Sequence, residues 1–341
     1  MSADLKRDVL GYITRAAADP EWGLALREPM GLRIHAYQRA EIPHLDAFCG
    51  DADAKSLLQV PSVPVGLFKE GLNFCAGPSG RVFRTSGTTQ GRRGEHHMPD
   101  TQVYELAARL WWQACVPDCP TRVVSLVPNP AQAPDSSLGH MVHDFGSATL
   151  SYFDMERGVD HEGAWQALLA VQQPVFVAAT AFSMASLLEQ GPSLSLPQGS
   201  VCMVTGGFKG RKVSLSSKDL LEQIPERLGT PVVEEYGMSE LSSQLWGRPE
   251  TTGAGRFHAP PWMLVYTVDP ATGQHQPGQR RGEDVGCTPD PQAARVLGRW
   301  DLRWGSQTSL EGIYALLPGA PSSLGGQTCV PCAGIQSPEC I

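Results

Sequence analysis

Apolar residues near the start of the chain recur at helical spacing. Leu5, Val9, Tyr12 and Ile13 stand at positions i, i+4, i+7 and i+8. Side chains with this spacing share one face of a helix, so the pattern predicts an N-terminal helix that packs on a core. We expect residues 60–68 to be extended and not helical. Two prolines lie in this segment, and proline disfavours helical backbone in the residue that precedes it.

The middle of the chain alternates between strand-like and helix-like patterns. Buried strands are predicted over 122–128, 175–179, 200–205 and 231–236, a short strand at 82–83, helices over 164–171, 183–189 and 217–228, a helix from Thr101 and a helix or loop over 136–145. This alternation predicts an α/β fold with a mostly parallel sheet flanked by helices. Ligands bind where such strands end, and polar loops follow predicted strands at 84–94, 206–210 and 236–240.

Length, charge and hydropathy narrow the class of protein. The 341 residues suggest two domains, or one large α/β unit with an appendage. Lys and Arg number 27 against 35 Asp and Glu, and the net charge of -8 argues against a dedicated nucleic-acid-binding module. The sequence has no apolar run long enough for a membrane span and no signal-peptide core at its start, so we expect a cytoplasmic protein.

The nine cysteines fall into two groups. Six are scattered, and we expect them to be reduced and buried; they are Cys49, Cys75, Cys115, Cys119, Cys202 and Cys287. The other three, Cys329, Cys332 and Cys340, lie near the end of the sequence. A single C-x-x-C pair does not indicate structural zinc, and neither does the spacing of His140 and His143.

The first candidate for chemistry is the segment 84–94, RTSGTTQGRRG. Its glycines let backbone N–H groups approach an anion, while the hydroxyl groups and Arg92 and Arg93 add donors and positive charge. This composition fits a loop that wraps polyphosphate, although the spacing of a Walker loop is absent. A flexible surface turn is the alternative interpretation.

The second candidate is the segment 234–240, EEYGMSE, at the end of a predicted strand. Tyr236 can stack on a flat base, and Ser239 can donate a hydrogen bond to phosphate. Glu240 offers the hard oxygen ligand that Mg²⁺ prefers. A strand end with solvated carboxylates is the alternative, so this segment is more informative when it is combined with the first.

Together the two segments resemble the adenylate-forming superfamily, which includes acyl-CoA synthetases, luciferases and peptide-synthetase adenylation domains. Within it, the sequence is most similar to the acyl-protein synthetase branch, which supplies activated fatty acid to the aldehyde-forming reductase complex of luminous bacteria. The likeness includes Ile42-Pro43, the segment 60–69 and the segment 206–210, and it covers roughly residues 35–275.

The resemblance implies ATP and Mg²⁺ as cofactors and gives roles to individual residues. The implied phosphate contacts are Thr85, Ser86, Gly87, Thr88, Thr89 and Gly91, and the implied adenine pocket has Gly206, Gly207, Tyr236 and Gly237. The implied catalytic residues are Ser239, Glu240 and Arg93, with Glu240 as the Mg²⁺ ligand and Arg93 as the cation. Asp284 would hold the ribose hydroxyls, and Arg299 would belong to a hinge. His96 or His97 either lines the acyl pocket or is an ordinary strand histidine.

The resemblance also implies a domain boundary, and the sequence departs from the family around it. The large adenylate-forming domain is expected over 1–298, and an atypical C-terminal lid or tail over 299–341. Gln90 stands where the common loop has glycine, and Arg93 where lysine is frequent. The lysine that the family carries in its lid has no counterpart, because Lys218 is the last lysine of the sequence.

We therefore expect an ATP-dependent ligase that activates a carboxylic acid, fatty or aromatic, as an acyl adenylate. The acyl group would pass to a thiol of a protein, with an acyl-acceptor protein or a reductase subunit as partner. Two alternatives remain. One is an acid–CoA ligase of the phenylacetate type, and the other is a non-catalytic relative that binds an acyl group or a nucleotide. We expect neither a nucleic-acid partner nor a membrane span.

Overall fold

The structure is a computed structural model, and it describes the greater part of the first 265 residues. The described residues are 1–61, 63, 65–85, 93–116, 118–206, 216–247, 256–265, 285–286 and 313–315. The expected boundary near residue 298 and the candidates Asp284 and Arg299 lie outside them. The tail cysteines Cys329, Cys332 and Cys340 do so too.

Three consecutive helices open the chain: α1 (Ala3–Ala18), α2 (Pro20–Glu41) and α3 (Pro43–Cys49). The predicted N-terminal helix is confirmed, since Leu5, Val9, Tyr12 and Ile13 are all buried on one face of α1. Asp19 separates α1 from α2, and its side chain accepts a hydrogen bond from the backbone N–H of Trp22. This N-cap satisfies a donor that the first turn of α2 leaves free.

The expectation of an extended segment over residues 60–68 was wrong for its second half. Short 3₁₀ helices lie at η1 (Leu57–Gln59) and η2 (Val65–Lys69). Proline restricts the residue before it, whereas residues after it are free to enter a turn. Since Pro64 is the last proline of this stretch, Val65 can begin η2.

The centre of the molecule is a six-stranded sheet in the order β10-β9-β8-β7-β3-β4. Five strands are parallel and β10 is antiparallel; their bounds are β3 (Arg122–Leu126), β4 (Ala148–Ser151), β7 (Phe176–Thr180), β8 (Val201–Thr205), β9 (Val232–Gly237) and β10 (Gln244–Trp246). The predicted α/β fold with a mostly parallel sheet is confirmed.

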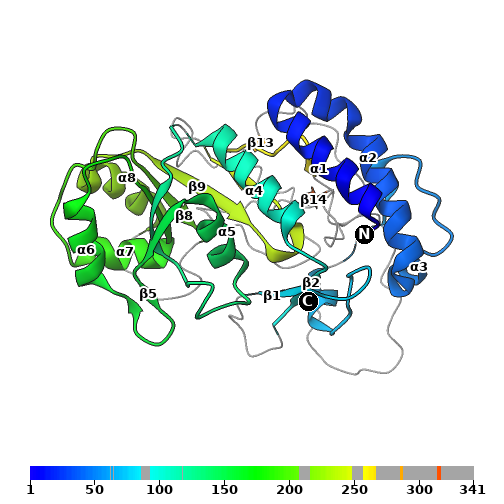
Figure 1. Cartoon of the computed structure of the whole chain (residues 1–341), viewed down its shortest axis with the longest axis horizontal. Coiled ribbons are helices and arrows are strands. Elements are labelled where there is room, and N and C mark those ends of the chain that lie inside the picture. Colours follow the sequence, from blue (N-terminus) through cyan, green and yellow to red (C-terminus); the bar gives the residue numbers. More distant parts are fainter. Residues whose placement is uncertain are drawn as a thin grey trace.

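Helices cover both faces of this sheet. On one face lie α4 (Gln102–Cys115) and α5 (Ser137–Phe145), with α1 packed on α4; on the other lie α6 (His161–Ala170), α7 (Ala181–Glu189) and α8 (Ser217–Leu228). Adjacent strand residues face opposite ways: Val123 joins the core around α4, and Val124 joins the core around α6–α8. Figure 1 shows α6, α7 and α8 together at the end of the molecule opposite α1–α3.

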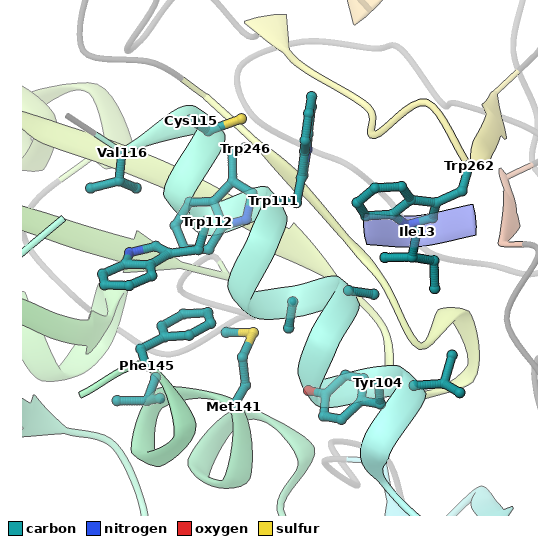
Figure 2. Close-up of a cluster of buried hydrophobic side chains, with 14 of the residues drawn as sticks. Ile13, Tyr104, Trp111, Trp112, Cys115, Val116, Met141, Phe145, Trp246 and Trp262 are labelled. Carbon is teal, nitrogen blue, oxygen red and sulfur yellow. The ribbon is translucent and has the colours of Figure 1, made fainter. Parts of the chain in front are cut away.

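Tryptophans dominate the core beneath α4. The ring of Trp112 stacks on Phe145, with 4.7 Å between centroids and 5° between planes. Trp111 donates from its indole N–H to the carbonyl oxygen of His258 at 3.1 Å, and Trp262 donates to Ser243 Oγ at 3.0 Å. Figure 2 shows these rings around α4. The Trp111 bond ties α4 to the chain that follows β10, and the Trp262 bond ties that chain to the residue before β10.

Short antiparallel pairs of strands form separate two-stranded sheets outside the main sheet. They are β1 (Arg81–Arg84) with β2 (Glu95–Met98), β5 (Phe153–Asp154) with β6 (Gly158–Val159), β11 (Arg256–Phe257) with β13 (Val285–Gly286) and β12 (Met263–Val265) with β14 (Ile313–Ala315). The polar segment 84–94 therefore joins the strands of a separate hairpin, not two strands of the parallel sheet. Among the described residues, no helix is both long and apolar enough to cross a membrane.

Candidate active site

The β1–β2 hairpin fixes both ends of the loop proposed to hold phosphate. The backbone N–H of Thr85 donates to the carbonyl oxygen of Gly94 at 2.9 Å, and the N–H of Gly94 donates to Thr85 Oγ1 at 2.9 Å. Thr85 is buried at this closure. Residues 86–92, among them the candidates Ser86, Gly87, Thr88, Thr89 and Gly91, lie outside the described residues.

Arg93 lies at the base of this loop and is held by three acceptors of the protein. Its guanidinium donates to the carbonyl oxygens of Thr85 at 2.7 Å and Arg84 at 3.1 Å, and to Asp135 Oδ2 at 2.8 Å. The side chain is still partly exposed. The structure thus places the predicted cation beside the loop, where it also braces the closure.

The second candidate segment is a reversal between β9 and β10. Tyr236 and Gly237 end β9, and the chain turns through η3 (Ser239–Leu241) before β10 pairs back with β9. The carboxylate of Glu235 folds over Gly237, so that a Cβ built on Gly237 would lie 2.6 Å from Glu235 Oε1. A Cβ at position 237 would therefore force the Glu235 carboxylate to move, whereas glycine leaves it in place.

Glu240 lies inside this turn with only 3% of its surface exposed. Its Oε1 has no hydrogen-bond partner in the described part of the chain. Burial raises the pKa of this carboxyl, and its own backbone N–H and the Lys69 ammonium act in the opposite direction. A buried, unpartnered carboxylate oxygen is costly, and a bound cation would satisfy it.

The two candidate segments meet in space. A Cβ built on Gly94 would lie 3.5 Å from Glu240 Oε1, and His96 Nε2 lies 3.1 Å from Ser242 Oγ. Ser239 Oγ also lies 2.8 Å from Ser137 Oγ, at the first residue of α5. The structure therefore brings together the hairpin, the turn after β9 and the N-terminal end of α5.

The end of β8 adjoins the same region. Gly206 follows β8 with φ of 68°, a left-handed backbone that favours glycine. Thr205, just before it, donates a hydrogen bond to Glu235 on the neighbouring strand β9. Burial raises the pKa of Glu235 to about 7, and the hydrogen bond from Thr205 opposes this shift. Gly207 lies outside the described residues.

Several residues of this region were not singled out by the sequence. Asp135 accepts from Arg93, Ser137 contacts Ser239, and Ser242 contacts His96. The serine that precedes α5, Ser136, caps that helix by accepting from the N–H of Gly139. An Asp-Ser-Ser run ahead of a predicted helix is a capping signal, but it does not show which loop it approaches.

The other histidine and cysteine candidates show no sign of a catalytic or metal site among the described residues. His140 pairs with Glu105 at 2.8 Å, and His143 with Ser151 Oγ at 3.0 Å. Among the described residues, no group of three or more His, Cys, Asp or Glu side chains could hold a metal ion. None of the described cysteines is paired in a disulfide; Cys49, Cys75, Cys115 and Cys202 are buried as expected, whereas Cys119 is only half-buried. Cys287 lies outside the described residues.

Comparison with known proteins finds similar solved structures only. No protein-family model and no curated protein matches the chain. O-succinylbenzoate CoA synthetase (MenE) of Bacillus subtilis, solved with ATP and magnesium, aligns at 19% identity over 60% of this chain and 40% of its own, with a TM-score of 0.42. ATP-bound MatB of Rhodopseudomonas palustris aligns at 18% over 57% and 37%, also at 0.42.

Coronafacic acid ligase of Pectobacterium brasiliense aligns at 18% identity over 48% of this chain and 32% of its own, with a TM-score of 0.35. This chain thus spans less than half the length of each of these three structures. Because all three TM-scores lie below 0.5, function is inferred from the residues of the site instead.

Proposed function

We propose that the protein is an ATP-dependent ligase that activates a carboxylic acid as its acyl adenylate. The observation that carries this proposal is the position of Glu240. Its Oε1 is buried without a partner among the described residues and faces the closure of the glycine- and hydroxyl-rich loop. A loop of this composition suits phosphate, and a free carboxylate oxygen beside it suits the cation that accompanies phosphate.

The residues at the site fit Mg²⁺ and ATP. Mg²⁺ is usually held by one or two carboxylates together with substrate phosphates, so one carboxylate at the site is sufficient. Glu240 would hold the cation, and the segment 85–91 would surround the phosphates. Tyr236, at the end of β9, would lie against the base together with Gly206, Gly207 and Gly237. Asp284 and Arg299 stay predictions from the resemblance, for the ribose hydroxyls and the hinge.

The chemistry of the proposed reaction requires positioning more than acid–base groups. A substrate carboxylate is already ionised at neutral pH, so its attack on the α-phosphorus needs no general base, and pyrophosphate leaves. When bound, Mg²⁺ offsets the phosphate charge. Ser239 presents its hydroxyl next to Ser137 at the N-terminal end of α5, where backbone dipoles favour an anion. Arg93 adds positive charge at the base of the loop.

We further propose that the acid is fatty or aromatic and that the acyl group passes to a protein thiol. The described cysteines do not suit this step, because Cys115 is buried and burial raises the pKa of the Cys49, Cys75, Cys119 and Cys202 thiols. The acceptor would then be one of Cys329, Cys332 and Cys340, or a thiol of an acceptor protein or reductase subunit. The domain division at 298/299 is part of the same proposal.

Acid-dependent exchange of pyrophosphate into ATP tests the adenylation step. A panel of fatty and aromatic acids is assayed with wild type, Glu240→Ala and Glu222→Ala; Glu222 lies exposed on α8 and serves as the matched control. We expect exchange in wild type and the control, and none in Glu240→Ala. Thr88→Ala and Thr89→Ala should each raise the KM for ATP. Exchange in Glu240→Ala at the wild-type rate would contradict the role of Glu240.

The acyl acceptor is tested separately. The protein is incubated with ATP and the acid that gives the fastest exchange, with and without CoA. The masses of the protein and of the small-molecule products are then measured by mass spectrometry. A mass increase on the protein without CoA supports transfer to its own thiol. An acyl-CoA product supports the acid–CoA ligase alternative. Absence of exchange with every acid, together with measurable nucleotide or acid binding, supports the non-catalytic alternative.

A further inference from the structure

A hydrogen bond joins the two candidate segments at their base. His96 on β2 and Ser242 after η3 are 146 positions apart, and His96 Nε2 lies 3.1 Å from Ser242 Oγ. Each residue has only 1% of its surface exposed. Because both side chains are shielded from solvent, water does not compete for this hydrogen bond, and the bond restrains the two segments strongly.

Each partner is directly attached to a part of the proposed site. His96 follows the loop closure at Gly94 by two residues, and both are buried on the same face of the hairpin. Ser242 follows Glu240 by two residues and ends the turn with φ of 51°, a left-handed backbone that serine seldom adopts. The strained turn that presents Glu240 therefore ends at the residue bound by His96.

Besides Ser242, the imidazole of His96 contacts an aromatic ring. The Phe68 ring packs against it with 5.8 Å between centroids, and His96 Nδ1 is buried without a hydrogen-bond partner among the described residues. Among the described residues, Ser242 is thus its only hydrogen-bond partner. A buried ring with this contact fits a brace between the two segments.

We infer that His96 and Ser242 are a positioning pair: their hydrogen bond holds the Glu240 turn against the hairpin that carries the phosphate loop. This inference rests on the proposed function, because Glu240 and the loop must grip one Mg²⁺–triphosphate together. If the bond is lost, Glu240 can drift from the closure at Gly94, and the loss should affect Mg²⁺–ATP binding more than turnover.

The test compares variants that differ in reach. In His96→Gln the amide nitrogen can take the place of Nε2, whereas the shorter side chain of His96→Asn cannot reach Ser242. Ser242→Gly removes the hydroxyl but relieves the left-handed strain, so it keeps the experiment informative if His96→Asn does not fold. His143→Asn is the matched control, because it breaks a similar His–Ser contact, to Ser151 at 3.0 Å, away from the site.

Two readouts are measured on the full chain. In pyrophosphate exchange, we expect the KM for Mg²⁺–ATP to rise about tenfold in His96→Asn and Ser242→Gly, the equivalent of one lost hydrogen bond, with kcat nearly unchanged. His96→Gln should stay within about twofold of wild type. Hydrogen–deuterium exchange without nucleotide should quicken over 238–244 in the two disrupting variants and not in His96→Gln or His143→Asn.

The outcomes separate the inference from the proposed function. Unchanged KM and unchanged amide exchange in Ser242→Gly would overturn the positioning pair while leaving the ligase proposal standing. Equal losses in His96→Gln and His96→Asn would also overturn it. If the wild-type protein neither binds nor uses ATP, the ligase proposal is wrong, and so is the role of the pair in ATP binding. Amide exchange would then still show whether the hydrogen bond holds the turn.

Discussion

Glu240 Oε1 lies 3.5 Å from the position that a Cβ would take on Gly94. The two residues come from a hairpin outside the main sheet and from the turn after β9, so their proximity is a product of tertiary folding. Gly94 closes the proposed phosphate loop, and Glu240 is the proposed Mg²⁺ ligand. A side chain at position 94 would therefore stand in van der Waals contact with Glu240 and crowd Thr85 at the closure of the loop.

We expect Gly94→Ala to weaken Mg²⁺–ATP use with only a small loss of stability. The added methyl group would lie 3.2 Å from Thr85 Cγ2, closer than most carbon contacts, so the Thr85 side chain that closes the loop must shift by a few tenths of an ångström. Gly11→Ala is the control, because a Cβ there meets nothing within 4 Å. On the exposed side of α1 it should stabilise the fold by about 0.5–1 kcal/mol. Equal exchange kinetics in both variants would contradict the crowding.

Arg93→Lys should not act as a conservative change. A lysine ammonium cannot span the carbonyl oxygens of Thr85 and Arg84 and the carboxylate of Asp135 at the same time. We expect a higher KM for ATP and a loss of stability of about 1 kcal/mol, the usual contribution of a hydrogen bond. Arg157→Lys, on the turn of the β5–β6 pair, is the control. Chemical denaturation and exchange kinetics measure the two effects, and wild-type values in both would contradict the bracing role.

The raised pKa of Glu235 predicts that the stability of the fold depends on pH. Its pKa is raised from 4.5 to about 7 by burial, so the folded state binds more protons than the unfolded state between these values. The contribution is fully present below pH 4.5 and is lost as the pH rises through about 7. From 1.36 kcal/mol per unit, the loss is about 3 kcal/mol at most.

Glu235→Gln keeps a side chain of the same shape that can still accept from Thr205, but it does not titrate. We expect the free energy of unfolding of the variant, relative to wild type, to rise between about pH 5 and about pH 8. Denaturant titrations of both proteins at several pH values measure this difference. Other titrating groups are common to both proteins and cancel. Parallel pH curves would mean that Glu235 does not carry the raised pKa.

The core beneath α4 offers a test of packing away from the site. Trp112 is fully buried and stacks on Phe145, and its indole N–H has no partner in the described part of the chain. Trp112→Ala should cost about 3–5 kcal/mol, because it leaves a large cavity. Trp112→Phe should cost much less, since it keeps a ring and removes a buried unpaired donor. Thermal melts compare the two, and similar losses would contradict this account.

The order of the elements could be predicted because it depends on local patterns. Alternating apolar runs and helical spacing located β3, β7, β8, β9 and most helices within a few residues, and the α/β class followed from their alternation. The extended conformation over 60–68 was wrong at Val65–Lys69, because the restriction by proline reaches only backwards along the chain. The separate hairpin of β1 and β2 was not foreseen, because pairing partners are not local.

The sequence by itself determined which chemical groups are available: a glycine- and hydroxyl-rich loop, a tyrosine and a carboxylate after a strand, and a buried sheet to carry them. Tertiary structure decided which of them meet. It buried Glu240 beside Gly94, bound His96 to Ser242 and set Arg93 against Asp135. The spacing of residues in the sequence shows which side chains share a face of one helix or strand. Contacts between residues far apart in the sequence depend on how the hairpin, β9 and α5 pack together.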